Sequence, residues 1–445
     1  MIRVMVAACG FVLLAGSAAA QSADPPPAPQ QRQPDQTFAV HGQATFVVQG
    51  VGGFASPYAG ANSLTPRQVR ETLDVTAYVG VRLWDGAELW ADPEIDQGFG
   101  LSDTLGVAGF PSAEAYKVGR SSPYARLQRL FVRQTIALGG PRQAVAAAAN
   151  QLGGMVDADR LVVTAGKFGV GDVFDTNGYA HDPRGDFLNW SAVDAGSFDY
   201  AADAWGYTTG IAAEAYRGAW TLRLGAFNLS KVPNGETLER DFSQYQLDAE
   251  IEHRHILAGQ PGAIRVTLFR NRGRFSRFDD ALALAAATGA PVDPAPTRRP
   301  MTRLGVHFNL EQQAGAALGL FARAGIADGA IEPYDFTDID RSAAIGGVLH
   351  GVAWRRPGDR IGLALIANGI SAAHRRFLAA GGLGVLVGDG RLPDAAAEQI
   401  VEVFYAMVVG GRLEATIDAQ HIANPGYNRD RGPADILAVR LHAGF

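Results

Sequence analysis

The sequence is poor in cysteine and lysine, and each shortage narrows the chemistry open to the chain. Its single cysteine is Cys9, which lies in a segment that we expect to be removed on export. The mature chain then has no disulfide, no thiolate metal site and no cysteine nucleophile. Lysine occurs only at Lys117, Lys167 and Lys231, so a lysine-lined anion channel is not expected. The net charge of −6 is too small to indicate binding to nucleic acid.

Long apolar runs are also missing beyond the first residues. No stretch after residue 20 contains the roughly 20 consecutive apolar residues that a membrane-spanning helix needs. The amino terminus does carry an apolar run, Val4–Gly16, which follows Arg3 and precedes small residues up to Ala20. We interpret residues 1–20 as a secretory signal peptide. A lipoprotein box ending at Cys9 is the alternative, but the apolar region continues past that residue.

Residues 21–36 are rich in proline and glutamine. Such a composition forms a stiff, extended segment without a core, which we interpret as a periplasmic tether. Residues 37–445 are different, because apolar and polar residues alternate in many short segments. Alternation with period two is the pattern of a strand that has one face against lipid or a core and the other against water.

We predict sixteen strands in residues 37–445, an even number that suits a closed antiparallel barrel. The predicted ranges are 37–50, 69–83, 86–96, 126–138, 159–168, 204–217, 219–229, 243–257, 261–272, 301–312, 316–326, 342–355, 360–368, 398–409, 411–421 and 434–445. Tight, glycine-rich connections alternate with long ones between these ranges. The sequence therefore predicts an all-β fold, a transmembrane antiparallel β-barrel with short periplasmic turns and long extracellular loops.

One connection does not fit this scheme, and another fits it but has no assigned role. Residues 139–158 should form a short turn but are long and alanine-rich, and a small helix is one interpretation of them. Residues 273–300 form a long connection with an alanine-rich part and a proline-rich part, and we assign it no role.

The chain ends on an amphipathic strand, which carries Arg440 and His442 on its polar face. The other face holds Leu437, Val439, Leu441, Ala443 and Phe445. A terminal strand that ends in an aromatic residue is typical of bacterial outer-membrane barrels, and we expect the barrel-assembly machinery to engage it. An edge strand of a soluble all-β domain would alternate in the same way, but the signal peptide and the loop lengths favour the barrel.

The polar faces of the predicted strands carry charges of both signs. In a soluble core, unpaired ions would cost several kcal/mol each, whereas a water-filled lumen accommodates them. A barrel of about sixteen strands is too wide for side chains to fill. Sugars bind planar hydrogen-bonding groups and aromatic faces. The candidates for lining the pore and contacting sugar are Tyr78, Arg82, Glu88, Trp90, Asp92, Arg126, Arg129, Phe131, Arg133, Arg184 and Trp190.

Signals for enzymatic or metal chemistry are weak. The sequence has no nucleotide-binding glycine pattern, no His-Glu-x-x-His and no Gly-x-Ser-x-Gly. His253 and His255 share a strand face, which more often means polar lining than a metal site. Asp172–Gly178 is similar to a calcium loop, but Phe174 holds a position that needs a ligand. We therefore predict no catalytic residue, no metal and no cofactor.

Several long segments resemble the carbohydrate-selective porins of the OprB family. They are Glu114–Gly119, Arg126–Ile136, Ala165–Phe168, Phe174–Asn177, His181–Arg184, Phe187–Trp190, Phe198–Tyr207 and Asn424–Pro433. The resemblance spans nearly the whole mature chain. It implies a sixteen-stranded barrel in the bacterial outer membrane that passes sugars or small oligosaccharides passively. It also implies long loops that fold inward and narrow the pore.

The segment Asn177–Tyr200 is the loop that we expect to dip into the lumen, and capping of the outer rim is the alternative. Arg184 lies there among carboxylates, and ion pairs between them would make the loop rigid. Placement of Arg184 and Trp190 outside the barrel mouth would contradict this expectation. The alternatives are a general or acidic-solute porin of the same fold, an outer-membrane lipid or glycan hydrolase, and an adhesin or structural barrel. The sequence leaves open which sugar passes and whether the protein is a monomer or a trimer.

Overall fold

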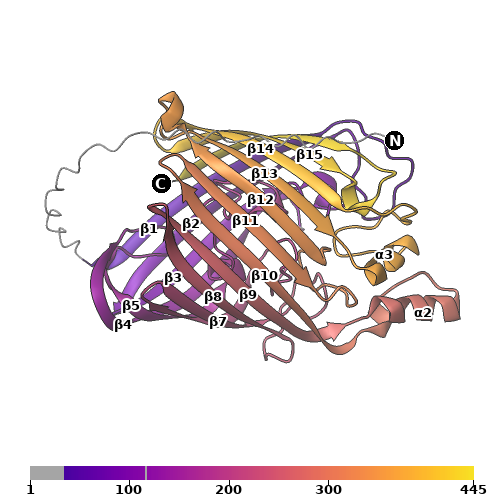
Figure 1. The fold of residues 1–445 in the computed structure, drawn as a ribbon. Coiled ribbons are helices and arrows are strands. Elements are labelled where there is room, and N and C mark those ends of the chain that lie inside the picture. Colours follow the sequence, from indigo (N-terminus) through magenta and orange to yellow (C-terminus); the bar gives the residue numbers. More distant parts are fainter. Residues whose placement is uncertain (1–34, 116–117, 445) are drawn as a thin grey trace.

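The computed structural model describes residues 35–115 and 118–444. The predicted signal peptide, most of the tether and Phe445 lie outside these ranges. The described strands pair in one closed antiparallel barrel, seen from the side in Figure 1. The predicted fold class is therefore confirmed. Within the described ranges, no helix is long and apolar enough to cross a membrane.

The barrel contains sixteen strands in simple up-and-down order, and its first and last strands pair to close it. The strands are β1 (Phe38–Val51), β2 (Gln68–Trp84), β3 (Ala87–Gly98), β4 (Arg120–Val145), β5 (Gly154–Phe168), β6 (Thr208–Arg217), β7 (Trp220–Asn228), β8 (Tyr245–Leu257), β9 (Gln260–Phe275), β10 (Arg299–Ala314), β11 (Leu318–Ala327), β12 (Arg341–His350), β13 (Arg360–Gly369), β14 (Glu398–Val409), β15 (Leu413–Ala423) and β16 (Ala434–Gly444). The helices are α1 (Trp190–Val193), α2 (Phe278–Thr288) and α3 (Ala372–Ala379), with short 3₁₀ turns η1 (Leu101–Asp103), η2 (Val170–Asp172), η3 (Ala295–Thr297), η4 (Gly351–Trp354) and η5 (Pro425–Tyr427).

Each predicted strand overlaps one observed strand, and the differences lie at the ends. The prediction for 342–355 was too long, since residues 351–354 turn into η4, and the prediction for 204–217 began four residues before Thr208. The helix considered for 139–158 was wrong, because β4 and β5 continue into this segment as a long hairpin. Cross-strand backbone hydrogen bonds there outweigh the helix propensity of alanine.

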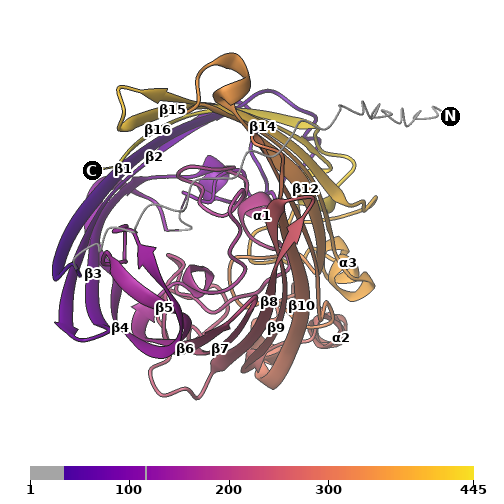
Figure 2. The ribbon, with the colours of Figure 1, turned by 60° about the vertical axis from the view of Figure 1, so that its left-hand side comes forward.

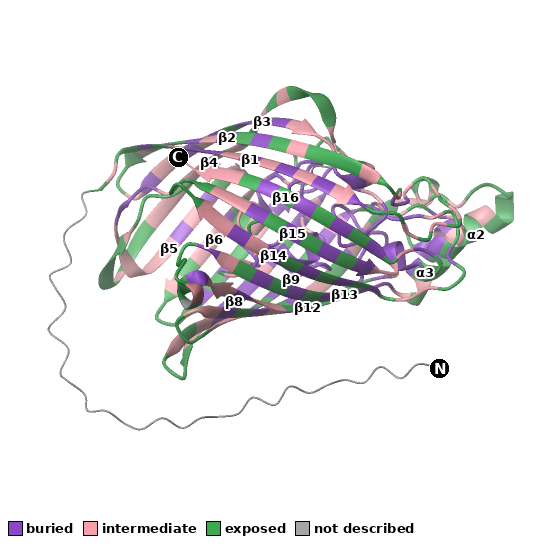
Figure 3. Ribbon diagram, turned by 90° about the horizontal axis from the view of Figure 1, so that it is seen from above, coloured by how far each residue is buried: buried purple, intermediate pink, exposed green. Residues whose placement is uncertain are grey.

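Residues along each strand alternate between buried and exposed positions, which Figure 3 shows as alternating colours. The two sets face the interior and the exterior of the barrel. In β10, Leu304 and Phe308 are exposed on the barrel exterior, whereas Arg303 and His307 are buried. This arrangement places apolar side chains where lipid lies and charged ones toward the interior. The two faces of this strand follow the period-two alternation of its sequence.

The two ends of the barrel differ as predicted. Short turns join strands at one end, such as the turn at Gly86, where φ is +73° and a Cβ atom would clash with the carbonyl oxygen of Thr135. Long loops, α2 and α3 lie at the other end (Figure 1). The unassigned segment 273–300 supplies α2, and Phe278 packs on His374 of α3 with ring centroids 4.4 Å apart.

Strand β4 contains a β-bulge near Leu127. The register against β3 shifts between Asp92, which pairs with Arg129, and Pro93, which pairs with Leu127. The extra residue lets Gln128 and Arg129 both reach inward, since Gln128 donates to Glu94 and Arg129 pairs with Asp92. A bulge re-aims side chains in this way without ending the strand pairing.

Candidate functional site in the barrel lumen

The loop between β5 and β6 crosses the interior of the barrel. On one wall, the Gly178 N–H donates to Glu311 of β10 at 2.6 Å. On other walls, the Leu188 N–H donates to Glu402 of β14 at 2.6 Å, and Arg184 pairs with Glu94 of β3 at 3.3 Å. Figure 2 shows α1, which is part of this loop, inside the ring of strands. The structure therefore places Arg184 and Trp190 in the lumen, as expected.

Charged side chains on the strands hold this loop by its backbone. Arg440 of β16 donates to the carbonyl oxygens of Pro183, Gly185 and Asp186, at 2.6, 3.0 and 2.8 Å. A loop buried in a barrel has few backbone partners of its own, and charge-assisted hydrogen bonds from the strands satisfy it. Some of the charged side chains on the inner faces of the strands therefore hold loops in place and do not face open water.

A second loop, between β3 and β4, lies beside the first. Glu398 of β14 accepts hydrogen bonds from the N–H groups of Ala108 and Gly109, at 3.0 and 2.8 Å. The two loops also bond to each other, since the Trp190 N–H donates to the carbonyl oxygen of Phe110 at 3.1 Å. Together they form a layer that narrows the lumen.

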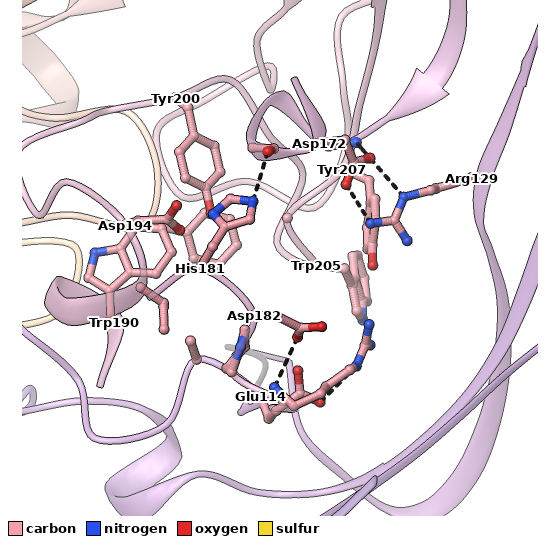
Figure 4. A pocket seen from close by; sticks show the side chains of 18 of the residues that line it. Glu114, Arg129, Asp172, His181, Asp182, Trp190, Asp194, Tyr200, Trp205 and Tyr207 are labelled. Atoms are coloured by element: carbon pink, nitrogen blue, oxygen red, sulfur yellow. Dashed lines mark hydrogen bonds and ion pairs between the residues drawn. The ribbon is translucent and has the colours of Figure 1, made fainter. Parts of the chain in front are cut away.

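A cavity of about 330 Å³ remains beside this layer. Its lining mixes polar and aromatic side chains: Trp190 and Tyr200 lie beside Asp194, and Trp205 and Tyr207 lie toward Arg129 (Figure 4). The polar lining residues include Glu114, Arg129, Asp172, His181, Asp182, Arg184 and Asp194, and the aromatic ones include Tyr78, Trp190, Tyr200, Trp205, Tyr207 and Phe336.

Arg184 is the centre of the main ion-pair cluster at the cavity. Its guanidinium lies 3.3 Å from Glu94 and 3.5 Å from Asp74 on the barrel wall, and 3.3 Å from Glu114 on the second loop. Burial alone would lower the pKa of Arg184, but these carboxylates hold its pKa well above the usual value. Only 12% of the side chain is exposed. Arg184 thus joins both loops to the wall through one permanent charge.

Arg129 forms a second ion pair in the cavity lining, and this pair is bidentate. Its Nε and Nη2 atoms donate to the two oxygens of Asp172, at 2.7 and 2.6 Å. The same guanidinium lies 4.9 Å from the ring centroid of Tyr207. Arg126 is similar, since it lies 3.4 Å from the ring centroid of Trp205. These contacts fix the planes of the arginines and the aromatic rings together.

Four aromatic rings at the cavity form a continuous array. Phe110 and Trp190 stack with centroids 5.1 Å apart and an interplanar angle of 14°. Trp190 meets Tyr200 at 5.5 Å, and Tyr200 stacks on Phe336 at 5.9 Å. Packed rings lose little conformational freedom when the apolar C–H face of a sugar ring stacks on them.

Asp194 lines the cavity and has a carboxylate that is free to accept hydrogen bonds from a solute. Among the described residues, no hydrogen bond or ion pair reaches its carboxylate, although it lines the cavity. Burial raises the pKa of Asp194 to about 6, against a lowering by the nearby His181. The Nδ1 atom of His181 is also without a partner among the described residues. Both groups suit the hydroxyls of a neutral solute.

The hairpin of β4 and β5 reaches the same cavity from the short-turn end. Its tip, residues 146–153, folds back so that Ala149 and Asn150 line the cavity. The side-chain amide of Asn150 donates to Asp92 at 2.9 Å, and Arg133 donates to the Asn150 carbonyl oxygen at 2.6 Å. Leu152 is buried in the apolar cluster of the barrel wall. The alanine-rich segment therefore forms part of the lumen.

A second cavity, of about 470 Å³, continues toward the short-turn end. It is lined by His41 and His442, which lie near the start of β1 and the end of β16. Tyr78, Ala149 and Asp182 line both cavities, so the two spaces adjoin.

The eleven predicted residues occupy four different settings. Tyr78, Arg129, Arg184 and Trp190 line the first cavity. Three others do not line this cavity but contact residues that do: Asp92 contacts Arg129, Arg126 contacts Trp205, and Arg133 contacts Asn150. Arg82 and Glu88 lie toward the short-turn end, where they bond to the Gln36 carbonyl oxygen and the Leu152 N–H. Trp90 and Phe131 are buried in the apolar cluster of the wall.

Trp90 shows why period-two reasoning was insufficient for these last residues. It does point inward, but its ring lies over Gly80, where a Cβ atom would collide with it. The indole is fully buried and is absent from the lining of the described cavities. An inward-pointing side chain near the wall can pack there instead of facing the solute.

Sequence reasoning missed several lining residues. Trp205 and Tyr207 were assigned to a strand, but they precede β6 and turn into the lumen. The aromatic-Gly-aromatic pattern at 205–207 was the available signal. Asn150 carried no signal, because its role depends on the fold-back of the hairpin.

The acidic loop segment Asp172–Gly178 is engaged by arginines. Asp172 pairs with Arg129 at 2.6 Å, and Asp175 pairs with Arg323 at 3.1 Å. Within residues 35–115 and 118–444, no group of three or more His, Cys, Asp or Glu side chains is arranged to hold a metal ion.

Comparisons with known proteins agree with this architecture. The model of the family described as carbohydrate-selective porin, OprB family, matches residues 61–445. The high-pH structure of OprB from Pseudomonas putida is similar with a TM-score of 0.68 at 16% identity, over 92% of this chain and 94% of that one. The outer membrane channel DcaP of Acinetobacter baumannii gives a TM-score of 0.50 at 10% identity, over 92% and 97%. A search of curated proteins returned no match.

Proposed function

Because the chain belongs to the carbohydrate-selective porins of the OprB family, we propose that neutral sugars cross its barrel through the two adjoining lumen cavities. The protein is an outer-membrane porin. The observation that carries the proposed route is the sharing of Tyr78, Ala149 and Asp182 by the two cavities.

The chemistry of the first cavity supports sugars as the solutes. Aromatic rings lie beside polar groups that have free hydrogen-bonding capacity, such as Asp194 and His181, and a sugar offers apolar faces to the first and hydroxyl groups to the second. The arginines are already paired with carboxylates. Their charges are therefore compensated locally, which favours neutral sugars over acidic ones.

We expect sugar to block the ion current through single channels, and we expect Trp190→Leu and Asp194→Asn each to weaken this block. The first change removes the stacking surface and the second removes a hydrogen-bond acceptor. The loss of apparent affinity should be about two- to tenfold, which is the scale of one aromatic contact. The measurement is current noise in planar bilayers during titration with glucose and maltose.

A matched control is Asp394→Asn, which removes an exposed carboxylate that pairs with Arg429 in an extracellular loop. This variant should bind sugar like the wild type. An unchanged current at all sugar concentrations would contradict a sugar-binding route, and stronger block by acidic sugars than by neutral ones would favour the acidic-solute alternative.

The ion selectivity of the channel should depend on pH through Asp194. The pKa of this carboxyl is raised to about 6, so the group is ionised above that pH and neutral below it. Lowering the pH from 7.5 to 5 should reduce the ratio of cation to anion permeability by about twofold, because one lumen charge is lost. Reversal potentials in a salt gradient measure the ratio, and Asp194→Asn should reduce this change; the remainder comes from other buried carboxyls such as Glu114, whose pKa burial also raises.

A further inference from the structure

The exterior of β9 carries an unusual row of three arginines. Arg270, Arg272 and Arg274 occupy alternate positions and therefore project from the same face, which is the outer one. Below them on the same face lie Ile264, Val266 and Leu268, all exposed. The outer face of this strand is therefore apolar up to Leu268 and positively charged from Arg270 onward.

The height of the row places it at the membrane boundary. β9 begins at the short-turn end with Gln260 and runs toward the long loops. With a rise of about 3.4 Å per residue and a tilt near 40°, Arg270 lies roughly 26 Å above that turn. The apolar band of such barrels is about 25 Å tall. Arg270 therefore lies at the upper edge of the band, and Arg272 and Arg274 lie above it.

The row lacks protein partners, unlike an arginine on the inner face of the same strand. Arg265 points inward and pairs with Glu252 at 2.9 Å and with Glu311 at 3.3 Å. Among the described residues, no carboxylate forms an ion pair with the outer three, and Arg270 lies 6.0 Å from the ring centroid of Tyr245. Three like charges within about 14 Å repel one another unless an anion lies between them.

The neighbouring strands provide an apolar surface on both sides of the lowest charge. Arg270 lies between Leu247 of β8 and Leu304 of β10 in the strand register. Both leucines are exposed, and 55% of Leu304 is accessible. A ligand that meets this surface needs an anionic head above and hydrocarbon below. Guanidinium groups bind phosphate in a bidentate manner and are the preferred side chains for this task.

We propose that the row Arg270, Arg272 and Arg274 is a binding site for a phosphorylated lipid of the outer leaflet. The phosphate groups lie against the three guanidinium groups, and the acyl chains lie over Leu247, Leu268 and Leu304. The site is separate from the sugar route, since these side chains project from the opposite face of the barrel wall. It would fix the protein to its lipid neighbours at one side of the barrel.

The test uses the full-length protein in detergent and native mass spectrometry with lipid A that carries two phosphates. Replacing all three residues, as R270Q, R272Q and R274Q together, should weaken lipid binding by about ten- to a hundredfold. Lipid A without phosphates should bind wild type and variant equally weakly. The matched control replaces three exposed arginines away from the site, R142Q, R217Q and R375Q, and should bind like the wild type.

Single-channel conductance and sugar block should be unchanged in the variant, which separates this proposal from the proposed sugar route. Equal lipid binding by wild type and the R270Q, R272Q and R274Q variant would overturn the proposal, and so would an equal loss in the control. Displacement of the lipid by millimolar inorganic phosphate would show that the row binds free phosphate instead. A change in oligomeric state, measured by light scattering, would show that a second copy of the chain covers the row.

Discussion

Replacing Arg184 by alanine should release the inward-folded loop and change both the conductance and the ion selectivity of the channel. The change leaves Asp74, Glu94 and Glu114 without their shared counter-charge. Breaking a buried ion pair by removing one partner costs about 3–5 kcal/mol, which is enough to detach one end of the loop from the wall. We expect an increase in conductance of about twofold or more and a marked rise in cation selectivity.

The measurement is single-channel recording in planar bilayers, with limited proteolysis of the loop as a structural readout. Arg184→Lys keeps the charge but loses the fork geometry, so it should give an intermediate result. Arg70→Ala is the matched control, because it removes one exposed positive charge that has no ion pair among the described residues. Wild-type conductance and selectivity in a folded Arg184→Ala protein would show that the cluster does not hold the constriction.

Removing the tip of the β4–β5 hairpin should open the path at the short-turn end. In the strand register Ala137 faces Arg160, so replacing residues 138–159 with Asn-Gly should join the strands through a two-residue turn. The change deletes Ala149 and Asn150 from the cavity lining. We expect conductance to rise by about twofold or more and larger oligosaccharides to pass, because the remaining lumen of a sixteen-stranded barrel is wide.

Liposome swelling with sugars of increasing size measures the size limit. The single change Asn150→Ala removes the contact with Asp92 but keeps the tip, so its effect on conductance should be smaller. Heat-modifiable migration on gels checks that both variants are folded. A correctly folded deletion variant with the size limit of the wild type would mean that the tip does not narrow the route.

The strands and their faces were predictable because each depends on local chemistry. A side chain on a barrel strand meets either lipid or the interior, and the choice alternates with every residue. Leu304 and Arg303 are adjacent in the chain and need no distant information to be assigned to opposite faces. The same holds for Leu437 and Arg440 in the last strand, both of which lie as predicted.

The lining of the cavity was only partly predictable, since it depends on what the loops do. Arg184 and Trp190 were candidates because they lie in a long loop of a kind that, by the family resemblance, folds inward. Trp90 was proposed as a cavity-lining residue because the alternation of the strand indicates that its side chain points inward. Its burial against the wall depends on Gly80, which lies opposite it and leaves room for the ring. Asn150 was missed because nothing near it in the chain indicates that the hairpin folds back.

The sequence by itself determined the barrel, its two ends and the charge of its interior, because hydrophobic alternation and turn residues act over a few positions. Only the tertiary structure decided how the interior charge is used. Arg440 and Glu402 lie hundreds of residues from the loop that they hold, and such pairings arise when the barrel closes and brings its walls around that loop. The fold follows from local patterns, whereas the constriction follows from charges that meet across the lumen.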